Sequence, residues 1–332
     1  MAIKKTHIFI NGFGRIGRSL LRILMLDPAY KNFEIIGLND IESLETCAYL
    51  FEYDSVFGPF PGAVEHTDTA LIVNGKSIPF TAAQDIAALD LSAVDVVLEC
   101  TGMTGNRAIV ERGLDAGAKD VLISGPSDQA DVTVVLGAND QMLGDHHVVS
   151  NASCTTNALA PLIKTLDEAY GLISGHMTTV HCYTGSQPTV DKPRANPERS
   201  RAAALSMVPT TTSAHHMIEH VLPHLKGRVE ARAIRVPTAS VSAIDLTIQT
   251  EKRMTSEGVN AVLKAQTEHG ILGWTTKPLV STDLRMRRES LVVCERETSV
   301  SVGGLLRVFG WYDNEWGFSC RMLDMARLMA AR

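Results

Sequence analysis

The chain has 332 residues, of which 45% are hydrophobic and 20% are charged. This composition is typical of folded globular proteins, and the length predicts about two domains. Lysine and arginine number 31 against 37 aspartate and glutamate residues, which gives a formal charge of −6. That balance argues against an extended nucleic-acid surface, for which a basic domain is typical, but it leaves room for a local basic pocket that binds a small anion.

The cysteines and the apolar runs limit the classes of protein further. Six cysteines are scattered along the chain and no two have C-x-x-C spacing, so zinc ribbons and thioredoxin-type motifs are excluded and no metal site is expected. A disulfide scaffold is not expected either, and we predict a reducing, cytoplasmic location. The apolar stretches are too short for a membrane span or a signal peptide, so we expect no membrane association.

The first half of the chain alternates short apolar runs with helical patterns. Such alternation favours a parallel sheet with right-handed crossovers and helices on both faces, which is an α/β architecture. The expected strands are His7–Ile10, Phe33–Leu38, Val94–Cys100, Asp120–Ile123 and Val132–Leu136, and the expected helices are Arg15–Leu26 and Asn106–Ala116.

The pattern changes near residue 150. A helix is expected over Cys154–Tyr170, and a second one at the end of the chain over Phe318–Ala331. Longer strands with one polar face favour an antiparallel sheet in an α+β domain, and we expect them over Met177–Cys182, Val229–Val236 and Ser240–Gln249. The proline-containing segment 184–201 is predicted to be a long loop, and loops of this length are usually functional.

A glycine-rich turn follows the first expected strand and opens the first expected helix. It has the G-x-G-x-x-G spacing of a dinucleotide-binding turn, in which the helix N-terminus accepts the phosphates. The alternative is that these glycines serve the fold alone. The residues of the turn are Asn11, Gly12, Phe13, Gly14, Arg15, Ile16 and Gly17.

Asp40 follows the second expected strand, where a dinucleotide-binding domain has an acidic residue that accepts hydrogen bonds from the adenosine ribose. A carboxylate there would repel a 2′-phosphate, which favours NAD over NADP. The alternative is that Asp40 begins a turn or caps the helix that follows.

Cys154 lies in the first turn of an expected helix, preceded by capping residues. The helix dipole and the N–H groups of that turn favour a nucleophilic thiolate. The alternative is a small buried side chain, as most unpaired cysteines are. His181 ends an apolar strand and could serve as the base for such a thiol.

Several residues could bind anions. Arg199 and Arg201 lie in the long loop, and Arg235 ends an expected strand. The segment Thr210–Ser213 precedes a helix and offers hydroxyl and N–H donors. Each arginine alone could equally form a surface ion pair.

Taken together, five motifs resemble those of the phosphorylating glyceraldehyde-3-phosphate dehydrogenases, and the resemblance extends over essentially the whole chain. They are NGFGRIGR at 11–18, SNASCTTN at 150–157, TTVH at 178–181, RVPT at 235–238 and WYDNEWG at 311–317. The resemblance implies a Rossmann-type NAD-binding domain over residues 1–152, completed by a C-terminal helix at 318–332. It also implies a catalytic α+β domain with a mostly antiparallel sheet over residues 153–317, and a homotetramer.

The resemblance also implies a chemistry, in which the nucleophile matches Cys154 and the base matches His181. The thiolate attacks the aldehyde of glyceraldehyde 3-phosphate, hydride transfer to NAD leaves a thioester, and inorganic phosphate releases 1,3-bisphosphoglycerate. Further roles are assigned by matching position. The nicotinamide side of the cofactor would meet Thr101, Ser124 and Asn314, the substrate phosphate would meet Thr184 and Arg235, and inorganic phosphate would meet Ser153, Thr155, Arg199 and Thr212, with Ser213 beside them.

Some residues depart from the family pattern. Ser213 replaces a frequent glycine and could narrow the inorganic-phosphate site. Lys192 stands where NAD-specific members often have an apolar residue, so it could attract a 2′-phosphate, which Asp40 opposes. Two alternatives to the triose phosphate enzyme remain, namely erythrose-4-phosphate dehydrogenase and a nucleotide-binding regulator with vestigial catalysis.

Overall fold

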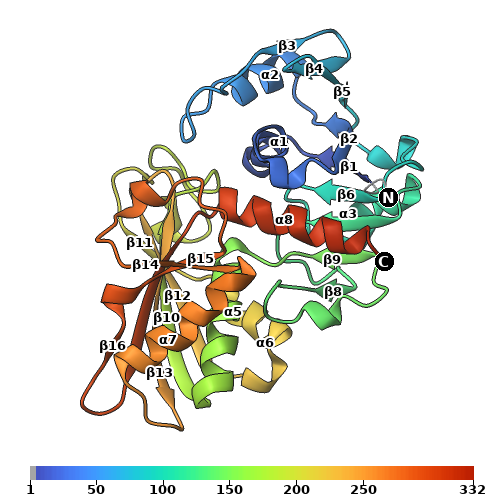
Figure 1. Cartoon of the computed structure of the whole chain (residues 1–332). Coiled ribbons are helices and arrows are strands. Elements are labelled where there is room, and N and C mark those ends of the chain that lie inside the picture. The colour runs from blue at the N-terminus through green and yellow to red at the C-terminus, as the bar shows by residue number, and fades with distance from the viewer. Residues whose placement is uncertain (1–4) are drawn as a thin grey trace. The chain divides into compact units, whose positions relative to one another are not determined.

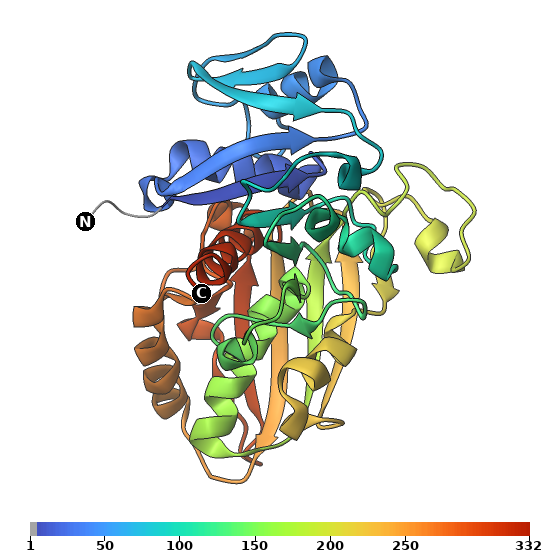
Figure 2. The same cartoon turned by 90° about the vertical axis from the view of Figure 1, so that its right-hand side faces the viewer.

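The computed structural model of the chain describes residues 5–332 (Figures 1 and 2). The chain divides into two compact units. Unit 1 contains the described residues up to Val134, together with Gln141–Ala152 and Ser319–Arg332. Unit 2 contains Val135–Asp140 and Ser153–Phe318. Within residues 5–332, no helix is both long enough and apolar enough to cross a membrane.

Unit 1 is built on a nine-stranded sheet with the order β3-β4-β5-β2-β1-β6-β7-β9-β8. From β5 to β8 each neighbouring pair is parallel, which confirms the predicted Rossmann-type sheet. The carboxyl end of β1 is a topological switch point, because β2 and β6 lie on its two sides, and ligands bind at such points. The strands are β1 (Thr6–Asn11), β2 (Phe33–Asn39), β3 (Val64–His66), β4 (Ala70–Val73), β5 (Lys76–Thr81), β6 (Val96–Glu99), β7 (Asp120–Ile123), β8 (Val132–Thr133) and β9 (Val148–Ser150).

The helices of unit 1 follow the sequence prediction in part. Helix α1 (Arg15–Leu26) has the predicted bounds. Helix α2 (Leu44–Glu52) was expected only as a helix after Asp40, without bounds, and Ser43 caps it rather than Asp40. The single helix expected over Asn106–Ala116 is wrong, because it divides into α3 (Arg107–Val110) and α4 (Arg112–Asp115). Gly113 explains part of this division. A Cβ at this position would lie 2.8 Å from Val121 and 2.9 Å from Val97, so packing against the sheet requires glycine. Glycine within a helix in turn weakens that helix.

Helix α8 (Trp316–Met329) brings the end of the chain into unit 1 (Figure 1). The Tyr30 hydroxyl donates to Asp324 Oδ1 at 3.2 Å, and Arg327 Nη2 donates to the Ala29 carbonyl at 2.9 Å. The Arg327 guanidinium also lies over the Tyr30 ring, 5.1 Å from its centre. These contacts join residues about 300 positions apart, with |i−j| of 294 and 298, so unit 1 is discontinuous in sequence.

Unit 2 contains an eight-stranded sheet with the order β11-β12-β10-β13-β17-β15-β14, and β16 pairs with β17. The sheet is mostly antiparallel, as predicted, but β10 and β12 are parallel, so the antiparallel expectation is wrong for that pair. The long connection between them contains α6 and lets the chain re-enter the sheet in the same direction. The strands are β10 (Leu172–Cys182), β11 (Val208–Thr210), β12 (Val229–Val236), β13 (Ser242–Thr250), β14 (Leu272–Thr275), β15 (Leu291–Cys294), β16 (Ser299–Val300) and β17 (Leu306–Tyr312).

Helices α5 (Cys154–Tyr170), α6 (Ala214–Val221) and α7 (Ser256–Ala265) cover one face of this sheet (Figure 2). Helix α5 has the predicted bounds, since the Ser153 side chain caps its start and Gly171, with φ +69°, ends it. Residues 158–160, 162, 163 and 166 of α5 are fully buried. This burial holds the helix in place, so the position of its first residue, Cys154, is set by the core of unit 2.

Candidate active site

The glycine-rich turn lies at the carboxyl end of β1, at the switch point of the unit 1 sheet. Gly12 has φ +94°, and a Cβ there would lie 2.7 Å from the Cys100 carbonyl carbon and from the Thr101 nitrogen. A Cβ on Gly17 would lie 2.2 Å from the Gly12 carbonyl oxygen. Both positions therefore require glycine, since the contacts are to backbone atoms that cannot rotate away.

Gly14 differs from the other two glycines. A Cβ there would meet nothing within 4 Å, and no side chain caps the first turn of α1, which begins at Arg15. The turn thus presents an open backbone beside a helix N-terminus, which fits the pyrophosphate of a dinucleotide. Ile16 is half-buried in the same first turn.

Asp40 ties the end of β2 to this turn. Its Oδ2 accepts a hydrogen bond from the Phe13 N–H at 2.6 Å, and its Oδ1 accepts one from the Glu42 N–H at 3.0 Å. The contact with the Glu42 N–H is that of a residue that begins a turn, which is one of the alternatives that the sequence left open for Asp40. The contact with the Phe13 N–H shows that Asp40 also shapes the glycine-rich turn, so the carboxylate serves the fold at the position where a ribose is expected.

A cavity of about 270 Å³ opens beside the turn. Its lining includes Asn11, Gly12, Gly14, Asp40 and Thr101, all of which the sequence predicts as cofactor residues. Ser124 does not line this cavity and is half-buried, with its N–H donating to the Glu99 carbonyl at 2.9 Å.

Glu99 is a residue at this site that sequence reasoning missed. It is 1% exposed, its Oε2 accepts from Asn11 Nδ2 at 2.6 Å, and its Oε1 accepts from the Thr101 N–H at 3.0 Å. One buried carboxylate thereby holds two cavity-lining residues. An acidic residue that ends the otherwise apolar stretch 96–98 was the available signal.

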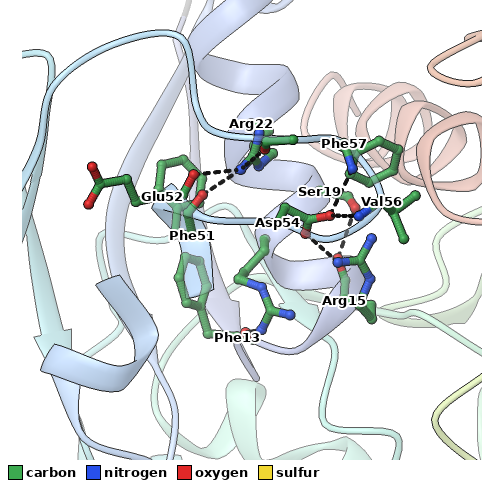
Figure 3. Close-up of polar contacts among 11 residues, drawn as sticks. Phe13, Arg15, Ser19, Arg22, Phe51, Glu52, Asp54, Val56 and Phe57 are labelled. Carbon is green, nitrogen blue, oxygen red and sulfur yellow. Dashed lines mark hydrogen bonds and ion pairs between the residues drawn. The ribbon is translucent and has the colours of Figure 1, made fainter. Parts of the chain in front are cut away.

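The guanidinium of Arg15 forms an ion pair with the buried carboxylate of Asp54 (Figure 3). Arg15 is therefore not a free cation that could bind a phosphate on its own. Asp54 also accepts hydrogen bonds from the backbone of Val56 at 2.8 Å and of Phe57 at 2.9 Å. Nearby, Arg22 donates to the Phe51 carbonyl at 2.6 Å. This cluster fixes α1 against the loop that follows α2, so it supports the helix whose N-terminus faces the cavity.

Unit 2 brings Cys154 and His181 together. The Cys154 Sγ lies 3.7 Å from His181 Nε2, although the two residues are 27 positions apart. Cys154 begins α5, and His181 lies near the carboxyl end of β10. Their separation is suited to proton transfer between a thiol and an imidazole.

Arg235 joins this pair because β10 and β12 are parallel and in register, with His181 opposite Arg235. Arg235 Nη1 lies 2.8 Å from His181 Nδ1 and donates to the Cys182 carbonyl at 3.0 Å. That carbonyl also lies 2.7 Å from His181 Nδ1. The imidazole is therefore held at one nitrogen and presents the other to the thiol.

Burial and the positive charge of Arg235 lower the pKa of His181 to about 4, so the imidazole is neutral at pH 7. Burial raises the pKa of the Cys154 thiol, whereas Arg235, Thr155 and the N–H groups at the start of α5 oppose that rise. Burial thus opposes the stabilised thiolate that the sequence suggests, whereas the helix start and Arg235 favour it. The thiol needs a base to become a nucleophile, and neutral His181 is within reach.

Tyr312 is a second residue that sequence reasoning missed. Its hydroxyl contacts Thr155 Oγ1 at 2.9 Å and Thr179 Oγ1 at 2.8 Å, and its ring meets the His181 ring edge-on at 6.0 Å. The buried Thr155 hydroxyl therefore has Tyr312 as a partner, which fixes its position beside Cys154. The sequence signal that could have identified Tyr312 is its position in the motif WYDNEWG.

The predicted inorganic-phosphate residues form a partial cluster. Arg199 Nε donates to Thr210 Oγ1 at 2.6 Å, and its Nη2 donates to Thr211 Oγ1 at 2.8 Å. Thr212 Oγ1 accepts from the Ala214 N–H at 3.3 Å at the start of α6, and Ser213 is exposed. The loop therefore delivers Arg199 to the threonine segment, as a site for an anion requires.

The remaining predicted residues of unit 2 have these neighbours. The Ser153 Oγ accepts from the Thr156 N–H at 3.1 Å, and Thr184 Oγ1 lies 2.9 Å from Ser186 Oγ. Asn314 is buried, and its Oδ1 accepts a hydrogen bond from the Cys182 thiol at 3.1 Å. In residues 5–332, no group of three or more His, Cys, Asp or Glu side chains is arranged to hold a metal ion.

A Rossmann-type nucleotide-binding unit and a half-buried thiol beside a buried imidazole define the class of protein. The glycine-rich turn and its cavity fit a dinucleotide, and the pair can attack a carbonyl and move a proton. Together they fit the class of NAD-dependent oxidoreductases that act on an aldehyde. Comparison with known proteins specifies the family. Residues 6–107 match a family model described as glyceraldehyde 3-phosphate dehydrogenase, NAD binding domain, and residues 153–314 match one described as glyceraldehyde 3-phosphate dehydrogenase, C-terminal domain.

The chain is also similar to curated relatives over nearly its whole length. A protein of Xanthobacter flavus named glyceraldehyde-3-phosphate dehydrogenase is 45% identical, and the similarity covers 97% of this chain and 98% of the relative. One of the same name from Geobacillus stearothermophilus is 43% identical, with 100% and 99% covered. The chain belongs to the glyceraldehyde-3-phosphate dehydrogenase family, and NAD is its cofactor.

Proposed function

We propose that the protein oxidises glyceraldehyde 3-phosphate with NAD and inorganic phosphate, and that the product is 1,3-bisphosphoglycerate. The observation that carries the proposal is the contact between Cys154 Sγ and His181 Nε2 at 3.7 Å. The names of the curated relatives supply the substrate, and they do not favour erythrose 4-phosphate as the substrate.

The first step uses the thiol. Cys154 Sγ forms a bond to the aldehyde carbon, the carbonyl π electrons move to oxygen, and the thiol proton passes through His181 Nε2 to that oxygen. The result is a hemithioacetal. Because His181 is neutral near pH 7, its Nε2 can accept the proton, and the Arg235 charge beside the ring drives the proton onward.

The second and third steps complete the reaction. His181 removes the hydroxyl proton of the hemithioacetal while the carbon loses a hydride, so the substrate is oxidised by two electrons to a thioester on Cys154. NAD supplies the hydride acceptor. A phosphate oxygen then attacks the thioester carbon, the carbon–sulfur bond breaks, and the proton held by His181 returns to the sulfur. The acyl phosphate leaves, and Cys154 is again a thiol beside a neutral imidazole.

Two groups of residues are proposed for the two phosphates. Thr184 and Arg235 would bind the phosphate of the substrate, and the charge of Arg235 beside His181 supports this. Arg199 and Thr212 would bind inorganic phosphate, together with Ser153 and Thr155. The contacts of Arg199 to neighbouring threonines support this assignment, since guanidinium and hydroxyl donors together favour an oxyanion.

The proposal includes a cytoplasmic homotetramer. None of the six cysteines is disulfide-bonded in residues 5–332, which suits a reducing compartment. Large apolar side chains of unit 2 are exposed, among them Leu205, Met207 and Val280, and a second copy of the chain could cover them. In this proposal Asn314, Thr101 and Ser124 contact the nicotinamide half of NAD.

The test is the initial rate of NADH formation from NAD and glyceraldehyde 3-phosphate, with and without inorganic phosphate. We expect a phosphate-dependent rate that falls at least about 10³-fold in Cys154→Ser, because the nucleophile is lost. Cys294→Ser is the matched control, since Cys294 is a buried cysteine of the same unit that lines a different cavity. A rate that is independent of phosphate, or that survives in Cys154→Ser, would contradict the proposal.

A further inference from the structure

Cys182 makes four hydrogen bonds beside the thiol–imidazole pair, yet no role has been assigned to its side chain. It is the last residue of β10 and is 1% exposed. Its carbonyl holds His181 and Arg235, and its N–H donates to Ser242 Oγ at 3.1 Å. Its Sγ donates to Asn314 Oδ1 at 3.1 Å, which joins residues 132 positions apart.

The direction of the hydrogen bond between Cys182 and Asn314 decides which group of the Asn314 amide is available to a ligand. The amide of Asn314 can accept through Oδ1 or donate through Nδ2. When Oδ1 accepts from the Cys182 thiol, the NH₂ group is directed away from Cys182. Asn314 is 6% exposed, and within residues 5–332 its Nδ2 has no hydrogen-bond partner. The NH₂ group can therefore donate a hydrogen bond to a ligand atom that accepts one.

The thiol of Cys182 is suited to the donor role. Burial raises the pKa of Cys182 to about 12, so its sulfur keeps its proton near pH 7. A thiolate could only accept a hydrogen bond and would turn the NH₂ group of Asn314 toward itself. The burial of Cys182 therefore maintains the orientation in which Asn314 offers a donor.

We propose that Cys182 is a positioning residue that orients the Asn314 amide, so that its NH₂ group donates to the carbonyl oxygen of the nicotinamide carboxamide. The inference rests on the proposed function, in which Asn314 contacts the nicotinamide. It adds the residue that sets the direction of that contact.

The experiment compares two ligands by equilibrium titration, NAD and ADP-ribose, the latter of which has no nicotinamide. In Cys182→Ala we expect the Kd for NAD to rise about 3- to 10-fold, the value of one hydrogen bond, while the Kd for ADP-ribose changes less than about twofold. In Cys182→Ser the hydroxyl donor is restored, and the Kd for NAD returns to within about twofold of the wild type.

Cys294→Ala is the matched control, since it removes another buried thiol of the same unit and should change neither Kd. Equal weakening of both ligands in Cys182→Ala would overturn the inference, because loss of packing acts on both. A serine variant that binds NAD as poorly as the alanine variant would also overturn it. Failure of the proposed function is seen separately, in a wild-type protein that binds NAD but forms no NADH with phosphate.

Discussion

His181 is held by two neighbours at one nitrogen, the Cys182 carbonyl and the Arg235 guanidinium. With the proton on Nδ1, the ring donates to the carbonyl and Nε2 carries the lone pair that faces Cys154. The nearby guanidinium disfavours a second proton on the ring. The Cys182 carbonyl therefore favours the tautomer that a base requires, and the charge of Arg235 keeps the imidazole neutral.

The lowered pKa of His181 also affects stability. An unfolded histidine has a pKa near 6.5, so between about pH 6.5 and 4 the unfolded chain binds a proton that the folded chain does not. Stability therefore falls as the pH drops through this window. The contribution between pH 7 and pH 5 is about 2 kcal/mol. We expect His181→Asn to lose that part of the pH dependence, as measured by urea unfolding at the two pH values.

The control is His216→Asn, which replaces an exposed histidine of the same unit. It should keep the pH dependence of the wild type. If His181→Asn kept the full dependence as well, the imidazole would not be buried in its neutral form, and its role as a base near pH 7 would need another explanation.

Among single residues, the sequence identifies those whose function can be inferred from their position in one helix or strand. Cys154 starts a capped helix and His181 ends a strand, and both lie where they were expected. Tyr312 and Cys182 could not be found in this way. Their contacts to Thr179 and Asn314 join residues more than 130 positions apart, with |i−j| of 133 and 132, and no local pattern encodes such contacts.

The start of α1 illustrates how an element combines structural and binding requirements. Gly17 faces a backbone oxygen, whereas Gly14 faces open space. We expect Gly17→Ala to destabilise unit 1 by more than about 2 kcal/mol, because the backbone must shift to admit the methyl group. Thermal unfolding measures this effect, and NAD titration should show weaker binding as well.

Gly14→Ala is the matched variant. We expect its melting temperature to stay close to that of the wild type, while the Kd for NAD rises at least about tenfold, because the methyl group occupies the space where a pyrophosphate approaches the backbone. Unchanged NAD affinity in Gly14→Ala would show that the phosphates bind elsewhere.

Element boundaries were predicted best where an apolar helical period is accompanied by a start or stop signal, such as Pro28 after α1 or Ser153 before α5. The bounds of α1 and α5 agree with the prediction, and both helices pack one face on a sheet core. The hairpin of β4 and β5 was missed, although Asn74 and Gly75 both have positive φ, as its two-residue turn requires. These strands lie near the sheet edge, where exposed polar residues weaken the hydrophobic pattern.

Unit 1 is assembled from three separated stretches of chain, and α8 is the last of them. We expect a variant that stops after Phe318 to lose NAD binding and the cooperative unfolding of unit 1, because α8 supplies side chains to the core that are at most 1% exposed. Hydrogen exchange followed by mass spectrometry measures the two units separately. These side chains belong to Cys320, Met322, Leu323, Met325, Ala326 and Met329.

The control for this truncation removes only Ala331 and Arg332. It deletes the ion pair between Arg332 and Asp120 but leaves the helix, so NAD binding should persist. Protection of the amides of β1 and β6 in the longer truncation would contradict the expectation, since it would mean that the parallel sheet is stable without its last helix.

The position of α8 also governs the order in which the protein can fold as it is made. The first segments of unit 1 leave the ribosome before most of unit 2, but the part of α8 that completes their core lies after Phe318. At about 5–20 residues per second, the residues between Ala152 and Ser319 take roughly 10–30 s to synthesise. During that interval the apolar surface awaiting α8 is uncovered, so the nascent chain is a natural client for chaperones that shield such surfaces.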